Sequence, residues 1–188
     1  MQNRTERLAL AREAARESSL ISGQNPRAEV ENFELHAGLM DDVMGCEHGR
    51  LTHPLIFNMI LCNSRMHTEY RKGIRASVRS IVPEALHVVS ILTDWWEKHD
   101  EASIEKMLVQ PDVDRHVYAW EQHDFLMSLE PFADANGRTA RLMYYNLLVA
   151  LKVPIKVIYS DKAVEYSTNM RRYRETTFVP LMKECGFL

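Results

Sequence analysis

The segment RTARLMYYNLLVALKVP, residues 138–154, constrains the fold of this chain more than any other. After its first turn almost every side chain is apolar, and the composition favours a helix. A helix that is apolar all round has to be buried, so other elements must surround it. We therefore expect this segment to form the central helix of the fold.

The rest of the chain favours helices too. Its 188 residues suffice for one domain with a core of its own. Only seven glycines and seven prolines interrupt it, and strand-like alternation is scarce. The predicted class is all-α, as a single domain over 1–188. One exception is a short β-hairpin expected near 74–82, where Arg75, Arg79 and small residues interleave with apolar ones.

Apolar periodicity and capping residues predict the individual helices. The first covers 3–17 and ends before SSLISGQNP, where Gly23 and Pro26 stop regular structure. The third begins with Thr52 as its cap ahead of Pro54. The later helices follow the same pattern, with two in the tail; the predicted ranges are 28–44, 52–67, 83–99, 101–109, 113–129, 138–154, 161–173 and 176–184.

Charge and cysteine content narrow the classes of partner. A formal net charge of −3 gives no global field for nucleic acid or an anionic membrane. Three arginines within 171–174 are too few, in an acidic chain, to make DNA the expected partner. No apolar run approaches the roughly 20 residues of a membrane span, and no secretory signal is visible. Three widely spaced cysteines suit the reduced thiols of a cytosol, so we expect a cytoplasmic protein.

A polar loop, LEPFADANGRTARL at 129–142, leads into the apolar helix. The first N–H groups of a helix lack internal partners, and a Gly-containing turn can aim several of them at phosphate oxygens. Asp134 suits Mg²⁺ bridged to those phosphates, and Arg138 and Arg141 share one helix face from which they could reach the outer phosphates. A plain turn with two solvated arginines explains the same residues and is favoured by composition alone.

The spacing of this loop resembles the signature of the Fic family (Fido fold), His-Pro-Phe-x-Asp/Glu-Gly-Asn-Gly-Arg-x-x-Arg. The helix ending in HDFLMSL, the apolar helix and a final helix containing Tyr166 are also similar to that family. The resemblance implies a mainly helical Fic fold and transfer of AMP from ATP to a Ser, Thr or Tyr hydroxyl of a target protein. Seven residues fall in register with the signature: Pro131, Phe132, Asp134, Asn136, Gly137, Arg138 and Arg141.

The resemblance implies ATP and Mg²⁺ as cofactors. Asp134 would hold the metal, and the amides around Ala135, Asn136 and Gly137 would cradle the α- and β-phosphates. The family usually has Gly where this chain has Ala135, and the methyl group removes backbone freedom there. Some relatives with Ala at this position transfer groups other than AMP, so another nucleotide-derived group stays open as the donor.

Other positions receive roles from the same resemblance. Arg138 and Arg141 would stabilise the outer phosphates as catalytic groups, and Phe132 would anchor the loop in the core. Tyr166 is expected beside the nucleotide. The segment near 74–82 would match the flap that holds a target peptide by strand addition.

Glu130 stands where the family has the His that acts as general base. An unperturbed imidazole has a pKa of about 6.5 and an unperturbed Glu of about 4.3, so Glu is the weaker base by about two units. Losing general-base catalysis costs roughly 10²–10⁴-fold, which would silence transfer without touching nucleotide binding. Kinases, however, use an Asp carboxylate to accept a substrate proton.

The N-terminal stretch 3–24 resembles a degenerate form of the family's autoinhibitory helix, Ser/Thr-x-x-x-Glu-Gly/Asn. Ser18 and Gly23 match, but Ser22 occupies the Glu position. Arg141 is therefore expected to have no partner from this helix. A Ser-rich helix cap explains the same residues equally well. Loss of both base and inhibitor suits a lineage released from catalysis, or a deliberate change at both positions.

The leading hypothesis is a Fic-like protein that binds a magnesium nucleotide at 130–141, with transferase activity impaired by Glu130. A catalytically inactive Fic-fold interaction or scaffold module is the alternative from another class. The expected partners are a nucleotide and a target protein with a hydroxyl side chain, without nucleic acid or membrane. The sequence is also compatible with a homo-oligomer, and with an effector that is delivered into a host cytosol.

Overall fold

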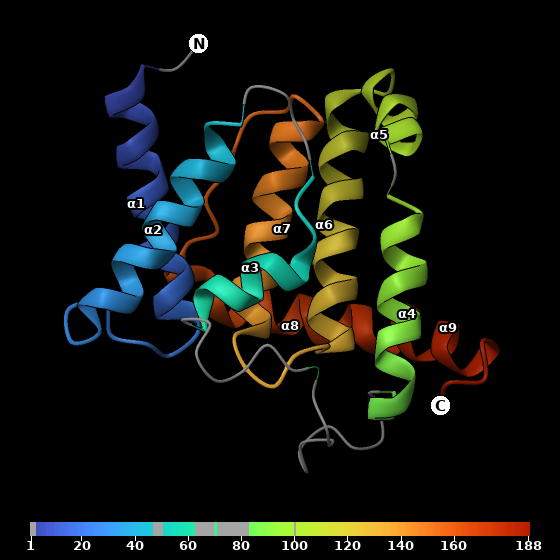
Figure 1. Ribbon diagram of the computed structural model, residues 1–188. Coiled ribbons are helices and arrows are strands. Elements are labelled where there is room, and N and C mark those ends of the chain that lie inside the picture. Colours follow the sequence, from blue (N-terminus) through green and yellow to red (C-terminus); the bar gives the residue numbers. More distant parts are fainter. Residues whose placement is uncertain (1–2, 47–50, 63–69, 71–82, 100) are drawn as a thin grey trace.

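The computed structural model describes residues 3–46, 51–62, 70, 83–99 and 101–188 (Figure 1). Most of them lie in helices, which confirms the all-α class for these residues. The hairpin expected near 74–82 lies outside the described residues. The helices are α1 (Arg4–Ile21), α2 (Val30–Met44), α3 (Pro54–Leu61), α4 (Ala85–Glu97), α5 (Glu101–Leu108), α6 (Asp112–Leu129), α7 (Asn136–Ala150), α8 (Ala163–Tyr173) and α9 (Val179–Glu184).

Helix α7 is the centre of the molecule, as its composition predicts. It packs against α1, α2, α3 and α6, and Figure 1 shows it between the α1–α2 pair and α6. Nearly all of its residues are buried, including the charged Arg138 and Arg141. Helix α7 is therefore enclosed by helices from both halves of the chain.

One apolar core connects α7 with the flanking helices. From α1 it takes Ala11, Ala14 and Ala15, small residues that let the helix lie close to its neighbours. At the other end of the chain it includes Phe178 and Met182. Helix α1 is thus packed into the domain, and its last turn lies at the start of α7.

Helix α1 extends further than its sequence predicts. It begins with a capping box, in which Asn3 and Glu6 satisfy each other's backbone N–H groups. It ends at Ile21, four residues beyond the predicted end, and Gly23 turns the chain at φ 74°. Serine favours helix ends because its hydroxyl competes for backbone partners, but the Ser18 hydroxyl bonds to another helix. The competition is thereby removed.

The start of α3 also differs in detail from the prediction. The cap is His53, whose Nδ1 accepts a hydrogen bond from the N–H of Leu55 at 3.1 Å, ahead of Pro54. Thr52 instead donates its N–H to Oδ1 of Asn146 in α7, at 2.7 Å. This contact ties the entry of α3 to the central helix.

The tail forms one continuous helical path instead of two separate helices. A π-helical turn, Arg174–Phe178, joins α8 to α9. Such turns insert an extra residue into a helix and redirect its side chains. Phe178 is buried in the core, while Arg174 reaches the C-terminal end of α6.

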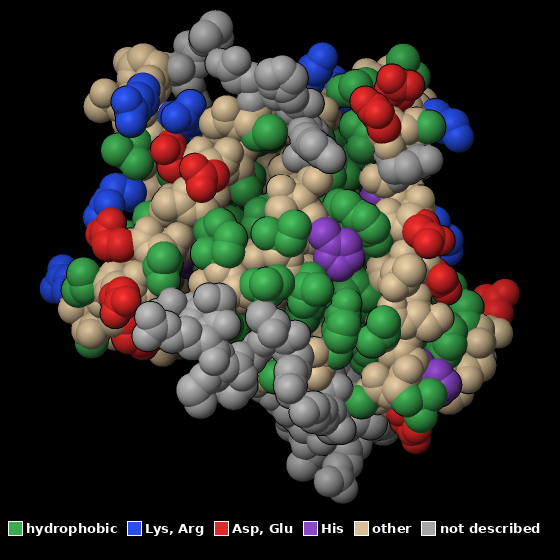
Figure 2. All heavy atoms as spheres, viewed as in Figure 1, with side chains coloured by type: hydrophobic (Ala, Val, Ile, Leu, Met, Phe, Trp, Pro, Cys, Tyr) green, Lys and Arg blue, Asp and Glu red, His purple; other side chains and the backbone are tan. Residues whose placement is uncertain are grey.

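Figure 2 shows apolar side chains gathered at the centre of the face on which α3 lies, with most charged groups toward its edges. Ile56 and Ile60 of α3 are among the exposed apolar residues of the chain. Among the described helices, none is both long and apolar enough to cross a bilayer.

Candidate functional site

Two residues with positive φ frame the loop between α6 and α7. Glu130 caps the C-terminal end of α6 at φ 46°, and Ala135 precedes α7 at φ 57°. This left-handed conformation costs a residue with a side chain about 1–2 kcal/mol, so the surrounding contacts have to stabilise it.

Side-chain amides provide those contacts. Asn136 bonds both the N–H and the carbonyl of Phe132, each at 2.8 Å, and so closes the loop on itself. Asn58 of α3 donates from Nδ2 to the carbonyl of Asp134 at 2.8 Å and to the Thr139 hydroxyl at 3.2 Å. The loop is thus held from inside and from α3.

Phe132 anchors the loop in the core. Its side chain is buried, and its ring stacks with that of Tyr70 at a centroid distance of 6.0 Å. The two residues also form an isolated antiparallel bridge.

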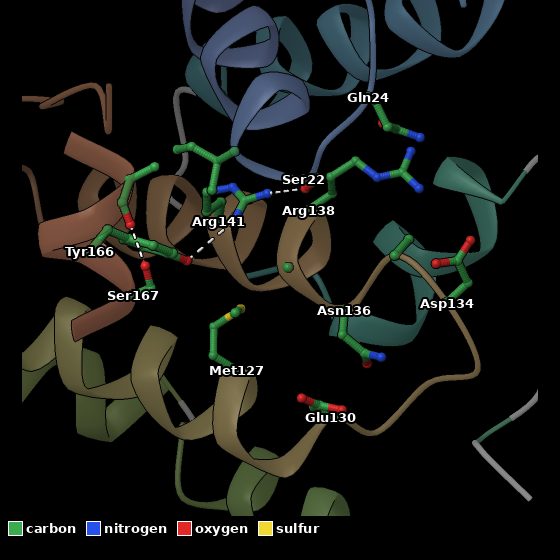
Figure 3. Close-up of a pocket in the computed structure, with 14 residues that line it drawn as sticks. Ser22, Gln24, Met127, Glu130, Asp134, Asn136, Arg138, Arg141, Tyr166 and Ser167 are labelled. Carbon is green, nitrogen blue, oxygen red and sulfur yellow. Dashed lines mark hydrogen bonds between the residues drawn. The ribbon is translucent and has the colours of Figure 1, made fainter. Parts of the chain in front are cut away.

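A cavity of about 410 Å³ opens beside the loop (Figure 3). Among the predicted site residues, Phe132, Ser18 and Gly23 are not part of its lining. Sequence reasoning missed five residues of its wall: Ile21, Gln24, Met127, Ala163 and Ser167. The cavity brings together nine predicted residues: Ser22, Glu130, Asp134, Ala135, Asn136, Gly137, Arg138, Arg141 and Tyr166.

Arg138 is a cation that lines this cavity, close enough to Asp134 to feel the charge of its carboxylate. It is 6 % exposed, and no described residue accepts a hydrogen bond from its guanidinium. Burial lowers its pKa, while the charge of Asp134 acts in the opposite direction. Within the described part of the chain, no side chain caps the first turn of α7, which carries Arg138. A buried cation beside a positive helix end suits an anion.

Arg141, by contrast, is held firmly by α1. Its Nε donates to Oγ of Ser18 at 2.7 Å, and its Nη2 donates to the Ser18 carbonyl at 2.9 Å and to Oγ of Ser22 at 2.5 Å. The expectation that Arg141 has no partner from this helix is therefore wrong. The last turn of α1 and its C-cap place Ser18 and Ser22 beside Arg141, and these serines accept hydrogen bonds without contributing a negative charge.

Tyr166 completes the surroundings of Arg141. Its hydroxyl accepts a hydrogen bond from Nη1 of Arg141 at 3.2 Å, a contact drawn as a dashed line in Figure 3. On its other side the hydroxyl lies 3.0 Å from Nε2 of His123. Helical spacing suggests only that His123 packs near the core surface or approaches the loop. In the structure it is fully buried and reaches the cavity through Tyr166.

Glu130 is paired with a residue from the π-helical turn. Its Oε1 lies 3.4 Å from Nη2 of Arg174, and the same nitrogen donates to the carbonyl of Met127 at 3.0 Å. In the sequence, Arg174 is one of three neighbouring arginines and nothing singles it out. Its register depends on the π turn, which no local pattern predicts.

Scans of protein-family models, curated proteins and solved structures returned no match to this chain. In the described regions, no group of three or more His, Cys, Asp and Glu residues gathers as a metal site.

A second cavity, of about 370 Å³, lies between α4, α6 and the C-terminal residues. Trp95, Tyr118 and Phe125 form aromatic walls, and none of the predicted site residues belongs to its lining. The polar cavity at α7 is therefore the candidate site.

Proposed function

We propose that this protein is Fic-like and binds a magnesium nucleotide in the cavity at the start of α7, with weak or absent adenylyl transfer of its own. The observation that carries the proposal is Arg138, a nearly buried guanidinium without a hydrogen-bond partner among the described residues. A phosphate bound beside it would supply charged hydrogen-bond acceptors for this guanidinium.

The remaining groups of the cavity suit the other parts of such a ligand. The first-turn amides of α7 would bind phosphate oxygens. Mg²⁺ is commonly held by one or two carboxylates together with substrate phosphates, and Asp134 supplies one carboxylate at the cavity. Ile21, Met127 and Ala163 give the cavity an apolar side that suits a nucleobase.

Impaired transfer follows from the residue at the base position. Glu130 pairs with Arg174 through Oε1, and a carboxylate has a second oxygen that can accept a proton from a target hydroxyl. An ordinary Glu is, however, a weaker base than His. Binding without transfer is the combination that these residues favour.

Calorimetry with Mg-ATP tests the binding proposal. We expect Arg138→Ala to weaken binding about 10- to 100-fold, because charge-assisted hydrogen bonds contribute about 1.5–3 kcal/mol. Arg171→Ala is the matched control, since Arg171 is exposed and does not line the cavity. Equal affinities for the two variants would contradict the phosphate role of Arg138.

Label transfer from α-labelled Mg-ATP tests the catalytic part. We expect Glu130→His to label itself or a target protein, and the parent to do so weakly or not at all. Absence of label from both would point to another donor group, or to an interaction module. A pure interaction module would also show no change in melting temperature with nucleotide.

A further inference from the structure

Behind Arg141 lies a chain of buried side chains that ends in a carboxylate. The Tyr166 hydroxyl of α8 lies 3.2 Å from Nη1 of Arg141 and 3.0 Å from Nε2 of His123 in α6. Nδ1 of His123 lies 2.8 Å from Oδ1 of Asp124, its neighbour in the sequence. All four residues are buried, and His123 is 0 % exposed. The chain therefore runs through the protein interior away from the cavity.

One arrangement of protons satisfies every group in this chain. With the carboxylate oxygen of Asp124 as acceptor, the proton of a neutral His123 belongs on Nδ1. Nε2 is then an acceptor, and the Tyr166 hydroxyl donates to it. The phenol oxygen in turn accepts from Arg141. Burial lowers the pKa of His123, which agrees with a neutral ring.

Asp124 is the negative charge that this chain brings toward Arg141. Among the described residues, the hydrogen-bond acceptors of Arg141 are two serines and Tyr166, none of them charged. A buried cation without a countercharge is costly, and hydrogen bonds in series polarise one another. The hydrogen bonds thus connect the carboxylate of Asp124 to Arg141 through two intervening groups.

The geometry also leaves part of Arg141 available at the cavity. Its five N–H groups donate four hydrogen bonds to Ser18, Ser22 and Tyr166, which leaves one N–H on Nη1. A methyl group on Gly137, a cavity residue, would lie 3.2 Å from Nη1. The remaining donor is therefore beside the first turn of α7.

We propose that Asp124 and His123 are positioning residues, which orient Tyr166 so that it holds Arg141 with one donor toward the cavity. Neither residue lines the cavity, so both act through Tyr166. The orienting role resembles that of the buried Asp behind the His of a Ser-His-Asp triad. Only the effect on ligand binding rests on the proposed nucleotide site.

The first test uses the unaltered full chain and needs no ligand. Long-range ¹⁵N–¹H correlation spectra of labelled histidine report the tautomer of each ring. We expect a neutral His123 with its proton on Nδ1 at neutral pH. A proton on Nε2, or a charged ring, would overturn the relay whether or not a nucleotide binds.

The second test is a double-mutant cycle of Tyr166→Phe and Asp124→Asn, with Mg-ATP affinity measured by calorimetry. We expect each single change to weaken binding about five- to tenfold. Asp124→Asn should have less than about a twofold further effect in the Tyr166→Phe background, because its path to Arg141 is already cut. Additive losses would overturn the proposal.

Tyr159→Phe is the matched control for loss of a phenol hydroxyl, since Tyr159 is exposed and bonds to Glu13 away from the cavity. If the parent binds no Mg-ATP, the proposed function fails, and the cycle is then read on the Arg141 Nε–H resonance. There a shift that Asp124→Asn causes only when Tyr166 is present supports the relay. An equal shift in both backgrounds refutes it, and variants that do not fold leave the decision to the tautomer.

Discussion

The carboxylate of Glu130 lies 3.4 Å from the guanidinium of Arg174, which also bonds to the Met127 carbonyl in the last turn of α6. A cation at a helix C-terminus is favourable because the helix dipole places partial negative charge there. Glu130 alone at this position would be unfavourable for the same reason. The π-helical turn thus supplies Arg174, a cation that offsets the negative charge of Glu130 at this helix end.

Removing this cation should destabilise the protein. For Arg174→Met we expect the free energy of unfolding to fall by about 1–2 kcal/mol, because the bonds to Met127 and Glu130 are lost. Urea denaturation measures the change. Arg171→Met, at an exposed neighbouring arginine, should stay within about 0.5 kcal/mol. Equal losses in the two variants would contradict a role for the pair.

Ala135 should gain from losing its side chain. Its φ of 57° is strained for Ala and free for Gly. We therefore expect Ala135→Gly to raise stability by up to about 0.5 kcal/mol, once the greater freedom of the unfolded chain and the loss of a buried methyl group are counted. Ala140→Gly, in the buried interior of α7, should instead lower it by about 1–2 kcal/mol. Denaturation midpoints of the two variants should move in opposite directions.

Gly137 and Gly38 allow one substitution to be compared in two helices. A methyl group on Gly137 would press on Nη1 of Arg141 at 3.2 Å, whereas on Gly38 in α2 it would meet nothing within 4 Å. Gly38→Ala should therefore raise stability by up to about 1 kcal/mol through helix propensity. Gly137→Ala should lower it by about 1 kcal/mol, because displaced bonds of a charged group outweigh that gain. If both substitutions stabilised the protein, the side chain of Arg141 would have to move aside at no cost in stability.

His36 should make folding sensitive to acid. It is buried in α2, and desolvation, followed by the charges of Arg141 and Arg138, lowers its pKa from 6.5 to about 3. Below about pH 6.5, His36 is protonated in the unfolded chain but stays neutral in the folded protein. The stability contributed by neutral His36 is therefore lost as pH falls, at about 1.4 kcal/mol per pH unit between those two pKa values.

His36→Gln removes this proton linkage. Between about pH 7.5 and pH 5 we expect the parent to lose about 2 kcal/mol more stability than the variant, by urea denaturation at each pH. The comparison at the higher pH corrects for the packing change, because His36 is neutral there in both states. The same loss in parent and variant would assign the acid sensitivity to other groups.

Local patterns in the sequence predicted a large part of the architecture. Apolar periodicity placed most helices, since a helix shows its buried face in the spacing of its residues. The central position of α7 followed from its composition. The end of α1 was missed because Ser18 and Ser19 look like terminating residues, and their burial against other helices overrides that preference.

Part of the candidate site could likewise be predicted from the sequence, and part could not. Its loop residues are contiguous, so their spacing alone brings Asp134, Ala135, Asn136, Gly137 and Arg138 together at a helix start. Arg141 bonds to Ser18 and Ser22, more than a hundred residues away, and to Tyr166, while Glu130 pairs with Arg174 of the π turn. Spacing cannot encode such contacts, because they depend on how whole helices pack and on where each helix ends.

The sequence by itself determined a helical chain around one apolar helix, and it predicts a phosphate-binding loop before that helix. Only the tertiary structure decided that Arg138 faces the cavity with no hydrogen-bond acceptor among the described residues, while Arg141 is bound by serines and connected to Asp124 through Tyr166 and His123. The two arginines are equivalent in pattern, three positions apart on one face. Their environments differ because α1 and α8 pack over one of them, and burial with hydrogen bonds is a property of the assembled helices.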